Sequence, residues 1–308
     1  MTITVGSITV DPIYEQPLDA VAVVVPDAQA AALKQIPWLA PPFIDAEGNP
    51  QGVVQAFLVR TGDTVVLIDP AVGDDKDISV VPEWNHNTTG FLYRLAGAGV
   101  QPEDIDIVVS THLHLDHVGW ATQLTENGWK PTFPNARYLF MGVEFRHWEN
   151  ESKQAVVHPA ADAPELDHVL ALFQETQIST FEQSVRPVQE AGQIDLIDEY
   201  GEIAPGITLV STPGHTPAHT SVSIRSGDDH LFLTGDAFHH PGQVAHPEWA
   251  ALSDVDGDQS TATRRRILAE LADTPTIVLG NHFAQPSMGR IVSDGTGGYI
   301  FDSSGLEA

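Results

Sequence analysis

The 308 residues include 42 acidic and 14 basic side chains, which give a formal net charge of −28, and no cysteine. An acidic surface repels phosphate backbones and anionic membranes, so neither nucleic acid nor a membrane is expected as a partner, although acidity also suits solubility or a salty cell interior. Without cysteine there is no disulfide framework, and no stretch reaches the roughly 18 apolar residues of a membrane span. The N-terminus has no secretory pattern. We therefore expect a cytoplasmic globular protein whose substrate is small and uncharged or apolar.

The N-terminal residues predict two short strands and then an irregular apolar segment. Valine and isoleucine alternate or run together in Ile3–Ile13 and Ala20–Val25, which is typical of strands. Residues 26–50 contain several prolines that break any helix, yet they are too apolar for an ordinary exposed loop. This segment either caps the functional site, packs on a partner subunit in a homodimer, or covers the core of its own domain.

An α/β order of elements follows. Val53–Arg60 and Thr64–Asp69 are predicted strands joined by a short hairpin turn. Thr89–Ala98 predicts a helix, and the β-branched run Ile105–Ser110 predicts a buried strand. Asp69, at the end of its strand, is a candidate to orient a metal ligand.

Four side chains of metal-ligand type follow that strand within Thr111–Trp120, which reads THLHLDHVGW. Extended geometry places His112 and His114 on the same face, while Asp116 and His117 come where the chain turns into a helix. They alternate with apolar residues in a partly buried place where unpaired polar groups are costly, which disfavours ordinary polar residues satisfied by water. Imidazole and carboxylate without thiolate suit zinc, iron, manganese or cobalt in a hydrolytic site. There is room for two adjacent metal sites.

A helical insertion is predicted at residues 143–190. Val143–Lys153 and Pro164–Gln177 have helical patterns. Three histidines of this region have no partner at ligand spacing, so they are expected at the surface or behind the ligands: His147, His158 and His168.

The second half of the chain restores the strand pattern and adds three ligand candidates. Strands are predicted at residues 207–211, 221–225, 230–234 and 276–279, with a helix at 260–272. His215 follows the first of these strands on a tight turn and can face the histidine cluster. Asp236 follows the third strand, and His282 follows the last.

The pieces HLHLDH, PGHTPAH, LTGD and GNH each follow a predicted strand, and in this order they resemble the metallo-β-lactamase superfamily of hydrolases over most of the chain. The resemblance implies an α+β fold, a four-layer αββα sandwich formed by a single domain of residues 1–308, with a dinuclear metal site at one edge of the two sheets. It also implies the following ligands: His112, His114 and His215 for the first metal, Asp116, His117 and His282 for the second, and Asp236 as a bridge between both.

The donor count agrees with this allocation, because five imidazoles and two carboxylates leave room for a bridging water. Two divalent ions would make hydroxide available at pH 7 to attack a C=O or P=O group. Zinc is the expected metal, with iron, manganese or cobalt as alternatives. No serine or cysteine nucleophile is required, and the chain has no GxSxG elbow. Asp116 is therefore a catalytic candidate as well as a ligand. His239, three residues after Asp236, is a candidate to orient the substrate oxygen, to shuttle a proton, or only to hydrogen-bond behind the ligands.

Departures from family patterns narrow the activity. β-Lactamases with a cysteine ligand do not match a chain without cysteine, and acidity disfavours glyoxalase-type thioesterases and RNA-processing nucleases, whose substrates call for basic side chains. Within the superfamily, the chain most resembles quorum-quenching acyl-homoserine lactonases and organophosphate hydrolases of the methyl-parathion-hydrolase kind. Many of those lactonases have tyrosine where this chain has His239, which is more like the organophosphate group.

Hydrolysis of an uncharged ester or lactone is the favoured hypothesis, with organophosphate triester hydrolysis as the alternative. A non-hydrolytic metal-binding or redox member of the fold is a third hypothesis. It fits less well, since 308 residues leave no space for a flavodoxin-like domain and no ligand is missing. Nearby, His219 is expected to be structural, and Arg264–Arg266 is predicted to lie on a solvated helix face.

Overall fold

Two compact units make up the chain in the computed structural model, which describes residues 2–306. The first unit contains the chain up to Gln55, the stretch Val59–Asp63 and the chain from Glu199 onward. The second unit contains Ala56–Leu58 and Thr64–Asp198. Within residues 2–306, no helix is both long and apolar enough to cross a membrane.

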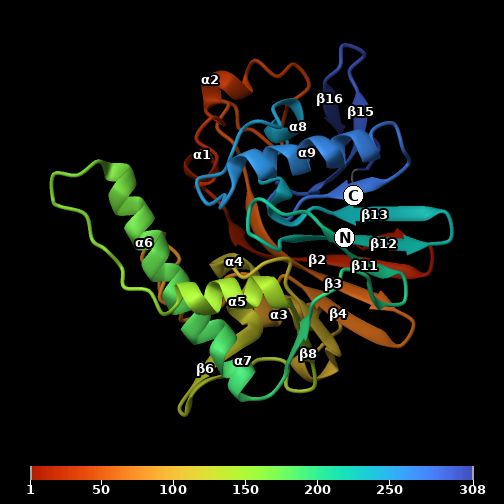
Figure 1. Cartoon of the computed structure of the whole chain (residues 1–308). Helices are drawn as coiled ribbons and strands as arrows, with labels where there is room; N and C mark the ends of the chain where they lie inside the picture. The colour runs from red at the N-terminus through yellow and green to blue at the C-terminus, as the bar shows by residue number, and fades with distance from the viewer. Residues whose placement is uncertain (1, 307–308) are drawn as a thin grey trace. The chain divides into compact units, whose positions relative to one another are not determined.

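The first unit is built on a seven-stranded sheet whose strands are hydrogen-bonded in sequence order, from β10 to β16. These strands are β10 (Glu202–Ala204), β11 (Ile207–Ser211), β12 (Thr220–Ser226), β13 (Asp229–Leu233), β14 (Ile277–Leu279), β15 (Met288–Ser293) and β16 (Tyr299–Asp302). The helix α9 (Gly257–Leu271) lies along this sheet (Figure 1). Shorter helical turns of the unit are α1 (Val21–Val24), α2 (Ala30–Leu33), η4 (Gly235–Ala237) and α8 (Gly242–Ala245).

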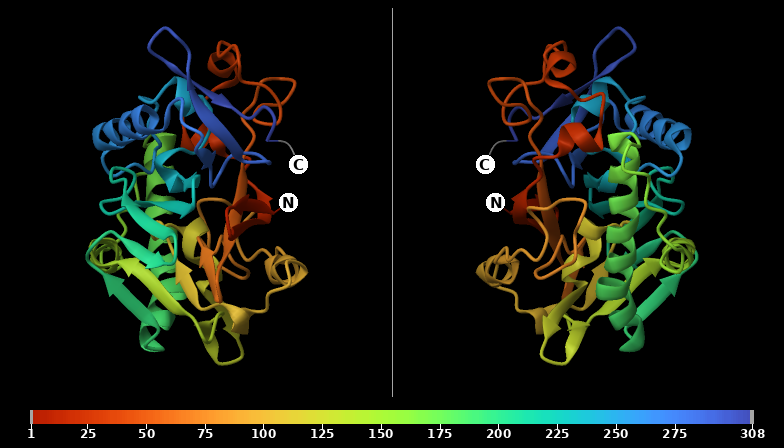
Figure 2. Two further views of the ribbon diagram at one scale, coloured as in Figure 1. Left: turned by 90° about the vertical axis from the view of Figure 1, so that its right-hand side faces the viewer. Right: turned by 90° about the vertical axis from the view of Figure 1, so that its left-hand side faces the viewer.

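The second unit contains four parallel strands, β4 (Thr64–Ile68), β5 (Ile107–Val109), β8 (Arg137–Met141) and β9 (Ile194–Ile197). Parallel strands need crossover connections, and helices supply most of them. The connections contain α3 (Phe91–Gly97), η1 (Pro102–Asp104), α4 (Leu115–Val118), η2 (Gly119–Ala121), the hairpin of β6 (Thr122–Thr125) and β7 (Gly128–Pro131), α5 (Gly142–Glu151), α6 (Glu165–Thr180), the π-helical turn η3 (Phe181–Val185) and α7 (Arg186–Glu190). The right-hand view of Figure 2 shows α6 along its length.

The strands β4, β5, β8 and β9 belong to a second seven-stranded sheet, in the order β1-β2-β3-β4-β5-β8-β9. Strands β1 (Ile3–Val5) and β2 (Ile8–Pro17) are part of the first unit, and β3 (Val53–Thr61) has residues in both units. The strands predicted at Val53–Arg60, Thr64–Asp69 and Ile105–Ser110 and those in the second half of the chain are therefore confirmed, and the strand predicted at Ile3–Ile13 falls on β1 and β2. The two helices predicted within residues 143–190 are confirmed as α5 and α6.

The prediction of a strand at Ala20–Val25 is wrong, because residues 21–24 form the helix α1. Val21 and Val25 are buried, whereas Val23 is 56% exposed. The buried side chains thus recur at a spacing of four, which is the helical period. A short apolar run fits strand and helix patterns equally well until its neighbours in space are known.

Residues 26–50 pack into the core of the first unit. Leu33 and Phe43 are buried in the same hydrophobic cluster as side chains from α9 and β16. The ring of Phe43 meets Phe283 and Phe301 edge to face, with centroids 6.5 and 5.6 Å apart. The apolar side chains of this segment therefore cover the core of their own unit, and a further part in capping the site or in a homodimer stays a prediction.

A buried histidine ties this segment to the core. Nε2 of His240 lies 2.8 Å from the carbonyl oxygen of Phe43, and its Nδ1 accepts a hydrogen bond from the backbone N–H of Gly242 at 3.0 Å. Because Nδ1 accepts, the ring is neutral and Nε2 donates. Burial lowers the pKa of His240 to about 4, and the hydrogen bond to Phe43 opposes this shift only in part.

We expect His240 to make the fold sensitive to mild acid. Its pKa is 6.5 when unfolded and about 4 when folded, so between these values the unfolded chain binds more protons and stability falls as the pH falls. Its contribution to the free energy of unfolding should fall by about 2 kcal/mol from pH 7.5 to pH 5. Urea denaturation of the wild type and His240→Gln at both pH values measures this. At pH 7.5 the stability difference between the two proteins reports the packing lost with the imidazole. An equal fall in the free energy of unfolding of both proteins between pH 7.5 and pH 5 would refute the role of His240 in acid sensitivity.

Candidate metal centre

In the second unit, Asp69 lies at the turn that follows β4. Its Oδ1 accepts a hydrogen bond from the backbone N–H of Thr111 at 2.7 Å, and its Oδ2 accepts one from the Thr111 hydroxyl at 2.9 Å. Nδ1 of His117 lies 3.0 Å from the same Oδ2. Strands β4 and β5 are parallel, so their carboxyl ends meet at one edge of the sheet, which explains these contacts. The structure therefore places Asp69 where it orients His117, as the sequence suggests.

The two histidines that share a strand face converge. Nε2 of His112 lies 3.0 Å from Nδ1 of His114, and both rings are buried. The other nitrogen of His112, Nδ1, lies 3.0 Å from the hydroxyl of Thr111. Two imidazole nitrogens this close, each aimed at the other, have the separation of neighbouring donors around one ion.

Asp116 and His117 come from the short helix α4. Their atoms Oδ1 and Nε2 are 3.7 Å apart, and the ring centroid of His117 lies 4.1 Å from that of His112. The helix ends at Gly119, whose backbone packs directly on Val72. A Cβ atom at Gly119 would lie 1.6 Å from the carbonyl oxygen of Val72, so only glycine fits at this position. This close approach fixes the end of the ligand-bearing segment against the turn after β4.

Side chains of α5 and α6 hydrogen-bond the backbone of the same segment. Gln177 accepts a hydrogen bond from the backbone N–H of Leu115 at 3.1 Å and donates one to the carbonyl of Leu113 at 3.4 Å. Glu144 accepts one from the backbone N–H of Leu113 at 3.4 Å. Helices α5 and α6 thus hold the backbone of the cluster, a role that the sequence pattern did not reveal.

In the first unit, three imidazoles surround the carboxylate of Asp236. Nε2 of His215 lies 3.4 Å and Nε2 of His239 lies 3.2 Å from Oδ2, while Nε2 of His282 lies 3.1 Å from Oδ1. All four side chains are buried. Asp236 follows β13 and His282 follows β14, and these strands are parallel, so their carboxyl ends are neighbours.

The remaining groups around Asp236 also have protein partners. Nδ1 of His215 lies 2.9 Å from Oδ1 of Asp254, and Nδ1 of His282 lies 2.9 Å from the carbonyl oxygen of Val53. The backbone N–H of Asp236 donates to Nε2 of His219 at 2.9 Å. His219 therefore orients the carboxylate-bearing residue, in agreement with the structural part expected for it.

His239 differs from its neighbours. Its ring is buried and stacks on His282 with an interplanar angle of 7°, but within residues 2–306 its Nδ1 has no hydrogen-bond partner. Burial lowers the pKa of His239, and the nearby charge of Asp236 opposes that shift. With Nε2 donating to Asp236, the lone pair of Nδ1 is available to a ligand.

The sequence did not reveal the roles of two residues of this region, Asp254 and Arg264. Asp254 was not singled out, since nothing in its acidic loop marks it as the partner of His215, 39 residues away. Burial by itself raises the pKa of Asp254, but the hydrogen bond with His215 and nearby positive charges outweigh it and hold the pKa at about 2. The prediction that Arg264 lies on a solvated helix face is wrong, because its side chain is fully buried. Arg265 and Arg266 are exposed as predicted.

The three histidines of the insertion are not part of a ligand cluster among the described residues. His158 lies at the surface, 3.3 Å from a carboxylate oxygen of Glu175. His147 packs edge to face on Trp148, and His168 is half-buried on α6. This placement agrees with the expectation that they lie at the surface or behind the ligands.

The residues of both units fit divalent transition-metal ions. Zinc–nitrogen bonds of about 2.1 Å in tetrahedral geometry place neighbouring donor atoms about 3.4 Å apart. The pairs His112–His114, His215–Asp236 and His282–Asp236 have donor separations of 3.0, 3.4 and 3.1 Å. Nδ1 of His215 and of His282 is hydrogen-bonded to an oxygen, and Nδ1 of His117 lies 3.0 Å from a carboxylate oxygen of Asp69, which leaves Nε2 of each ring to bind a metal.

Most of the chain matches one known family. Residues 49–282 match the model of the metallo-β-lactamase superfamily. The chain belongs to this superfamily. Its fold is therefore the metallo-β-lactamase fold with two sheets and helices, as the sequence motifs predict.

Two curated relatives share less than 30% sequence identity with this chain. The cytochrome P450 monooxygenase mpaDE′ of Penicillium brevicompactum is 25% identical over 221 residues, which cover 66% of this chain and 24% of that protein. The N-acyl homoserine lactonase AttM of Rhizobium radiobacter is 29% identical over 199 residues, which cover 62% of this chain and 64% of that protein. The chain thus spans about a quarter of the first relative and less than two thirds of the second.

Two solved structures of the same superfamily fold cover nearly the whole chain. AidC, a dizinc quorum-quenching lactonase in complex with a product, has a TM-score of 0.74 at 24% identity, over 98% of this chain and 97% of its own. The hydrolase AbOPH has a TM-score of 0.76 at 23% identity, over 98% of this chain and 96% of its own. At this identity the likeness shows the fold.

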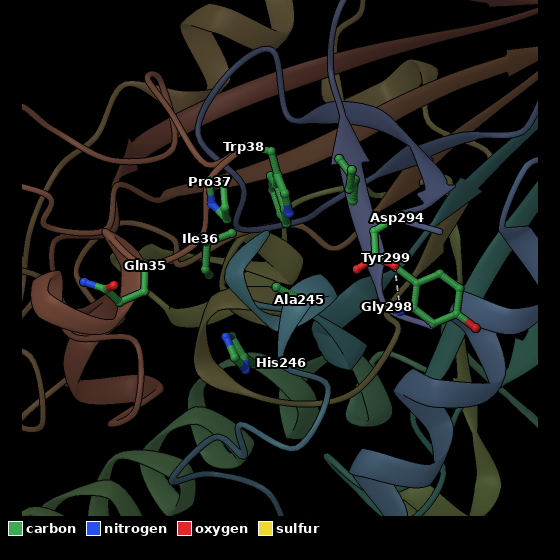
Figure 3. Close-up of a pocket in the computed structure, with 10 residues that line it drawn as sticks. Gln35, Ile36, Pro37, Trp38, Ala245, His246, Asp294, Gly298 and Tyr299 are labelled. Carbon is green, nitrogen blue, oxygen red and sulfur yellow. Dashed lines mark hydrogen bonds between the residues drawn. The ribbon is translucent and has the colours of Figure 1, made fainter. Parts of the chain in front are cut away.

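A pocket of about 400 Å³ lies elsewhere in the first unit (Figure 3). The segment around Trp38, the end of α8 at His246, and Tyr299 on β16 line it. It contains no residue from the ligand set that the superfamily motifs imply, so its walls carry none of the chemistry described above.

We expect Asp69→Ala to lower the free energy of unfolding by on the order of 3 kcal/mol, because two buried donors of Thr111 lose their acceptor and His117 loses the carboxylate beside its Nδ1. Asp69→Asn is the matched control. It keeps one acceptor oxygen and should recover most of the stability, yet its amide does not select the metal-binding tautomer of His117. Urea denaturation of the metal-free protein tests the first statement, and zinc affinity of the Asn variant tests the second. An alanine variant as stable as the wild type would contradict the role of Asp69.

Proposed function

We propose that this protein is a metal-dependent hydrolase that holds two divalent transition-metal ions, with zinc preferred over iron, manganese or cobalt. The proposed ligands are His112, His114 and His215 for one ion, Asp116, His117 and His282 for the other, and Asp236 for both. One observation carries the proposal. Asp236 directs Oδ2 at Nε2 of His215 and Oδ1 at Nε2 of His282, so each of its oxygens is paired with a ligand of a different ion.

When bound, such ions supply Lewis acidity and lower the pKa of a water molecule, so that hydrolysis needs no serine or cysteine nucleophile. The side chains of the protein do the rest. Asp69 and Asp254 keep Nδ1 of His117 and His215 protonated and thereby present Nε2 as the donor. Asp116, which is partly exposed, is the ligand nearest to solvent.

His239 is the proposed catalytic side chain that is not a ligand. Its Nε2 is against Asp236, and its Nδ1 is the buried acceptor available to a substrate. At Nδ1 the ring can orient a substrate hydroxyl or receive a proton from the attacking water. Its lowered pKa keeps the ring neutral, which this acceptor role requires.

An uncharged ester or lactone is the substrate class that we propose. The formal charge of −28 disfavours anionic substrates, and AttM, a relative, is named as an N-acyl homoserine lactonase. A phosphotriester is the second candidate. This candidate rests on His239, three residues after Asp236, since the organophosphate hydrolases that the chain resembles are more like it at this position than the lactonases with tyrosine. The side chain of His239 contacts the carboxylate of Asp236.

We expect two metal ions per chain in the wild type and a loss of both in Asp236→Ala, since that variant removes a charged ligand shared by both ions. His239→Ala is the matched control. It removes a buried imidazole from the same carboxylate and should keep two ions while activity falls by about 10²- to 10⁴-fold. Elemental analysis of protein loaded with zinc and then dialysed gives the stoichiometry. Equal metal loss in both variants would contradict the assignment of Asp236 as a ligand shared by both ions.

Hydrolysis should place water oxygen directly in the acid product. A panel of lactones, aryl esters, phosphotriesters and β-lactams, run on metal-analysed protein, gives the substrate class. For the best substrate, a single turnover in ¹⁸O-labelled water should yield labelled acid, or labelled phosphodiester from a triester. Unlabelled first-turnover product, or a stoichiometric acyl-protein adduct detected by mass spectrometry, would mean a side-chain nucleophile and would refute the mechanism.

A further inference from the structure

A buried arginine on α9 contacts the residue after Asp236 and the carboxylate of Asp254. The side chain of Arg264 has no solvent exposure. Its Nε donates to the carbonyl of Pro247 at 2.7 Å, and its Nη1 donates to the hydroxyl of Ser260 at 2.8 Å and to the carbonyl of Ala237 at 3.4 Å. Nη1 also lies 3.7 Å from Oδ2 of Asp254. One side chain thus bonds the residue after Asp236 and faces the partner of His215.

Stability alone does not explain a charge in this position. Taking a guanidinium and a carboxylate out of water is costly, and replacing a buried ion pair by apolar residues of similar size is often neutral or stabilising. An apolar side chain would serve the inner face of α9 equally well, as Ile267 and Leu268 do on the next turn. The pair Asp254–Arg264 therefore points to a requirement of the site.

The carboxylate of Asp254 is held in one orientation. Its Oδ1 faces Nδ1 of His215 at 2.9 Å, while its Oδ2 accepts a hydrogen bond from the backbone N–H of Ala251 at 3.0 Å and faces Arg264. The backbone N–H of Val255, the next residue, donates to the carbonyl of His215 at 3.0 Å. Side chain and backbone together join this loop to the histidine.

Helix α9 also fixes the turn that carries His215. Gly214 lies so close to the helix that a Cβ atom there would be 2.2 Å from the backbone nitrogen of Ser260. The hydroxyl of Thr263 donates to the carbonyl of Pro213 at 2.6 Å. The turn therefore has little freedom against α9, and a side chain on α9 is well placed to set the geometry of the histidine.

We propose that Asp254 and Arg264 are positioning residues of the metal centre. Asp254 keeps His215 in the tautomer with Nδ1 protonated, so that Nε2 presents its lone pair beside Asp236. Arg264 holds Asp254 and the carbonyl of Ala237 in a fixed relation, which keeps the donors of His215 and Asp236 at the separation one ion needs. This inference rests on the proposed function, because it assigns these residues to the same metal centre.

Metal affinity measured apart from activity tests the proposal. The variants are Asp254→Ala, Asp254→Asn and the double variant Asp254→Asn/Arg264→Met, with Arg265→Met as the control from the exposed face of the same helix. Zinc affinity is measured by chelator competition, and the melting temperature of each metal-free protein is measured beside it. Asp254→Ala should weaken zinc binding by about 10- to 100-fold, and Asp254→Asn by less, because its amide oxygen still accepts from Nδ1.

The double variant separates positioning from folding. It removes both buried charges together, which offsets part of the hydrogen bonding lost with Arg264, so its metal-free melting temperature should fall less than that of Asp254→Ala. Its zinc affinity should still fall by at least about 10-fold. Histidine ¹⁵N spectra of the metal-free proteins should show His215 protonated at Nδ1 in the wild type and in mixed tautomers in Asp254→Ala. Arg265→Met should change none of these values.

The outcomes distinguish this inference from the function on which it rests. A wild type that binds two ions, with Asp254→Ala and the double variant binding them equally tightly, would overturn the inference and leave the proposed function intact. A wild type that binds no metal would overturn both. A fall in zinc affinity of Arg265→Met equal to that of the double variant would also overturn the inference, since the effect would then not be specific to the buried pair.

Discussion

A neutral imidazole binds a metal only through the nitrogen that carries no proton, so its other nitrogen must donate that proton to the protein. Three of the proposed ligands have a carboxylate or carbonyl oxygen beside Nδ1, and each oxygen comes from a different residue. In the second unit a carboxylate oxygen of Asp69 lies 3.0 Å from Nδ1 of His117, and in the first unit the acceptors are Asp254 for His215 and the carbonyl of Val53 for His282. The positions of these acceptors decide which atoms can become ligands, so the surrounding fold must fix the acceptors as firmly as the histidines themselves.

Parallel strand pairing is the means by which each unit does so. Strands β4 and β5 bring the turn at Asp69 beside the start of the histidine cluster, and strands β13 and β14 bring Asp236 beside His282. Only parallel neighbours place two carboxyl ends at one sheet edge, and loops there are free to carry polar side chains. The last three residues of β4 and of β13 are apolar and buried, so the imidazoles and carboxylates of each unit follow a hydrophobic strand end.

The sequence predicted the parts of this arrangement that are local in the chain. The three histidines His112, His114 and His117 and the strand before them lie within residues 105–117, and Asp69 could be found because it ends a strand. Asp254 and Arg264 could not be found in this way. Their partners are set by packing between a loop and α9, and an arginine beside two others on a polar helix face has the pattern of a solvated residue until the burial of its side chain is known. The helical period of Val21 and Val25 was likewise hidden in a short apolar run.

The burial of these groups also couples the site to folding. Imidazoles and carboxylates taken out of water without an ion leave polar atoms that water would otherwise solvate, and this lowers the stability of the metal-free protein. An ion that binds only the folded chain raises stability by RT ln(1 + [M]/Kd), which is about 4 kcal/mol at a concentration 1,000 times Kd. A feature that tightens metal binding therefore also stabilises the folded protein under metal-replete conditions. Burial of the pair Asp254–Arg264 costs desolvation free energy. Tighter binding of the ion proposed for His215 and Asp236 offsets this cost, which explains how the pair can be retained.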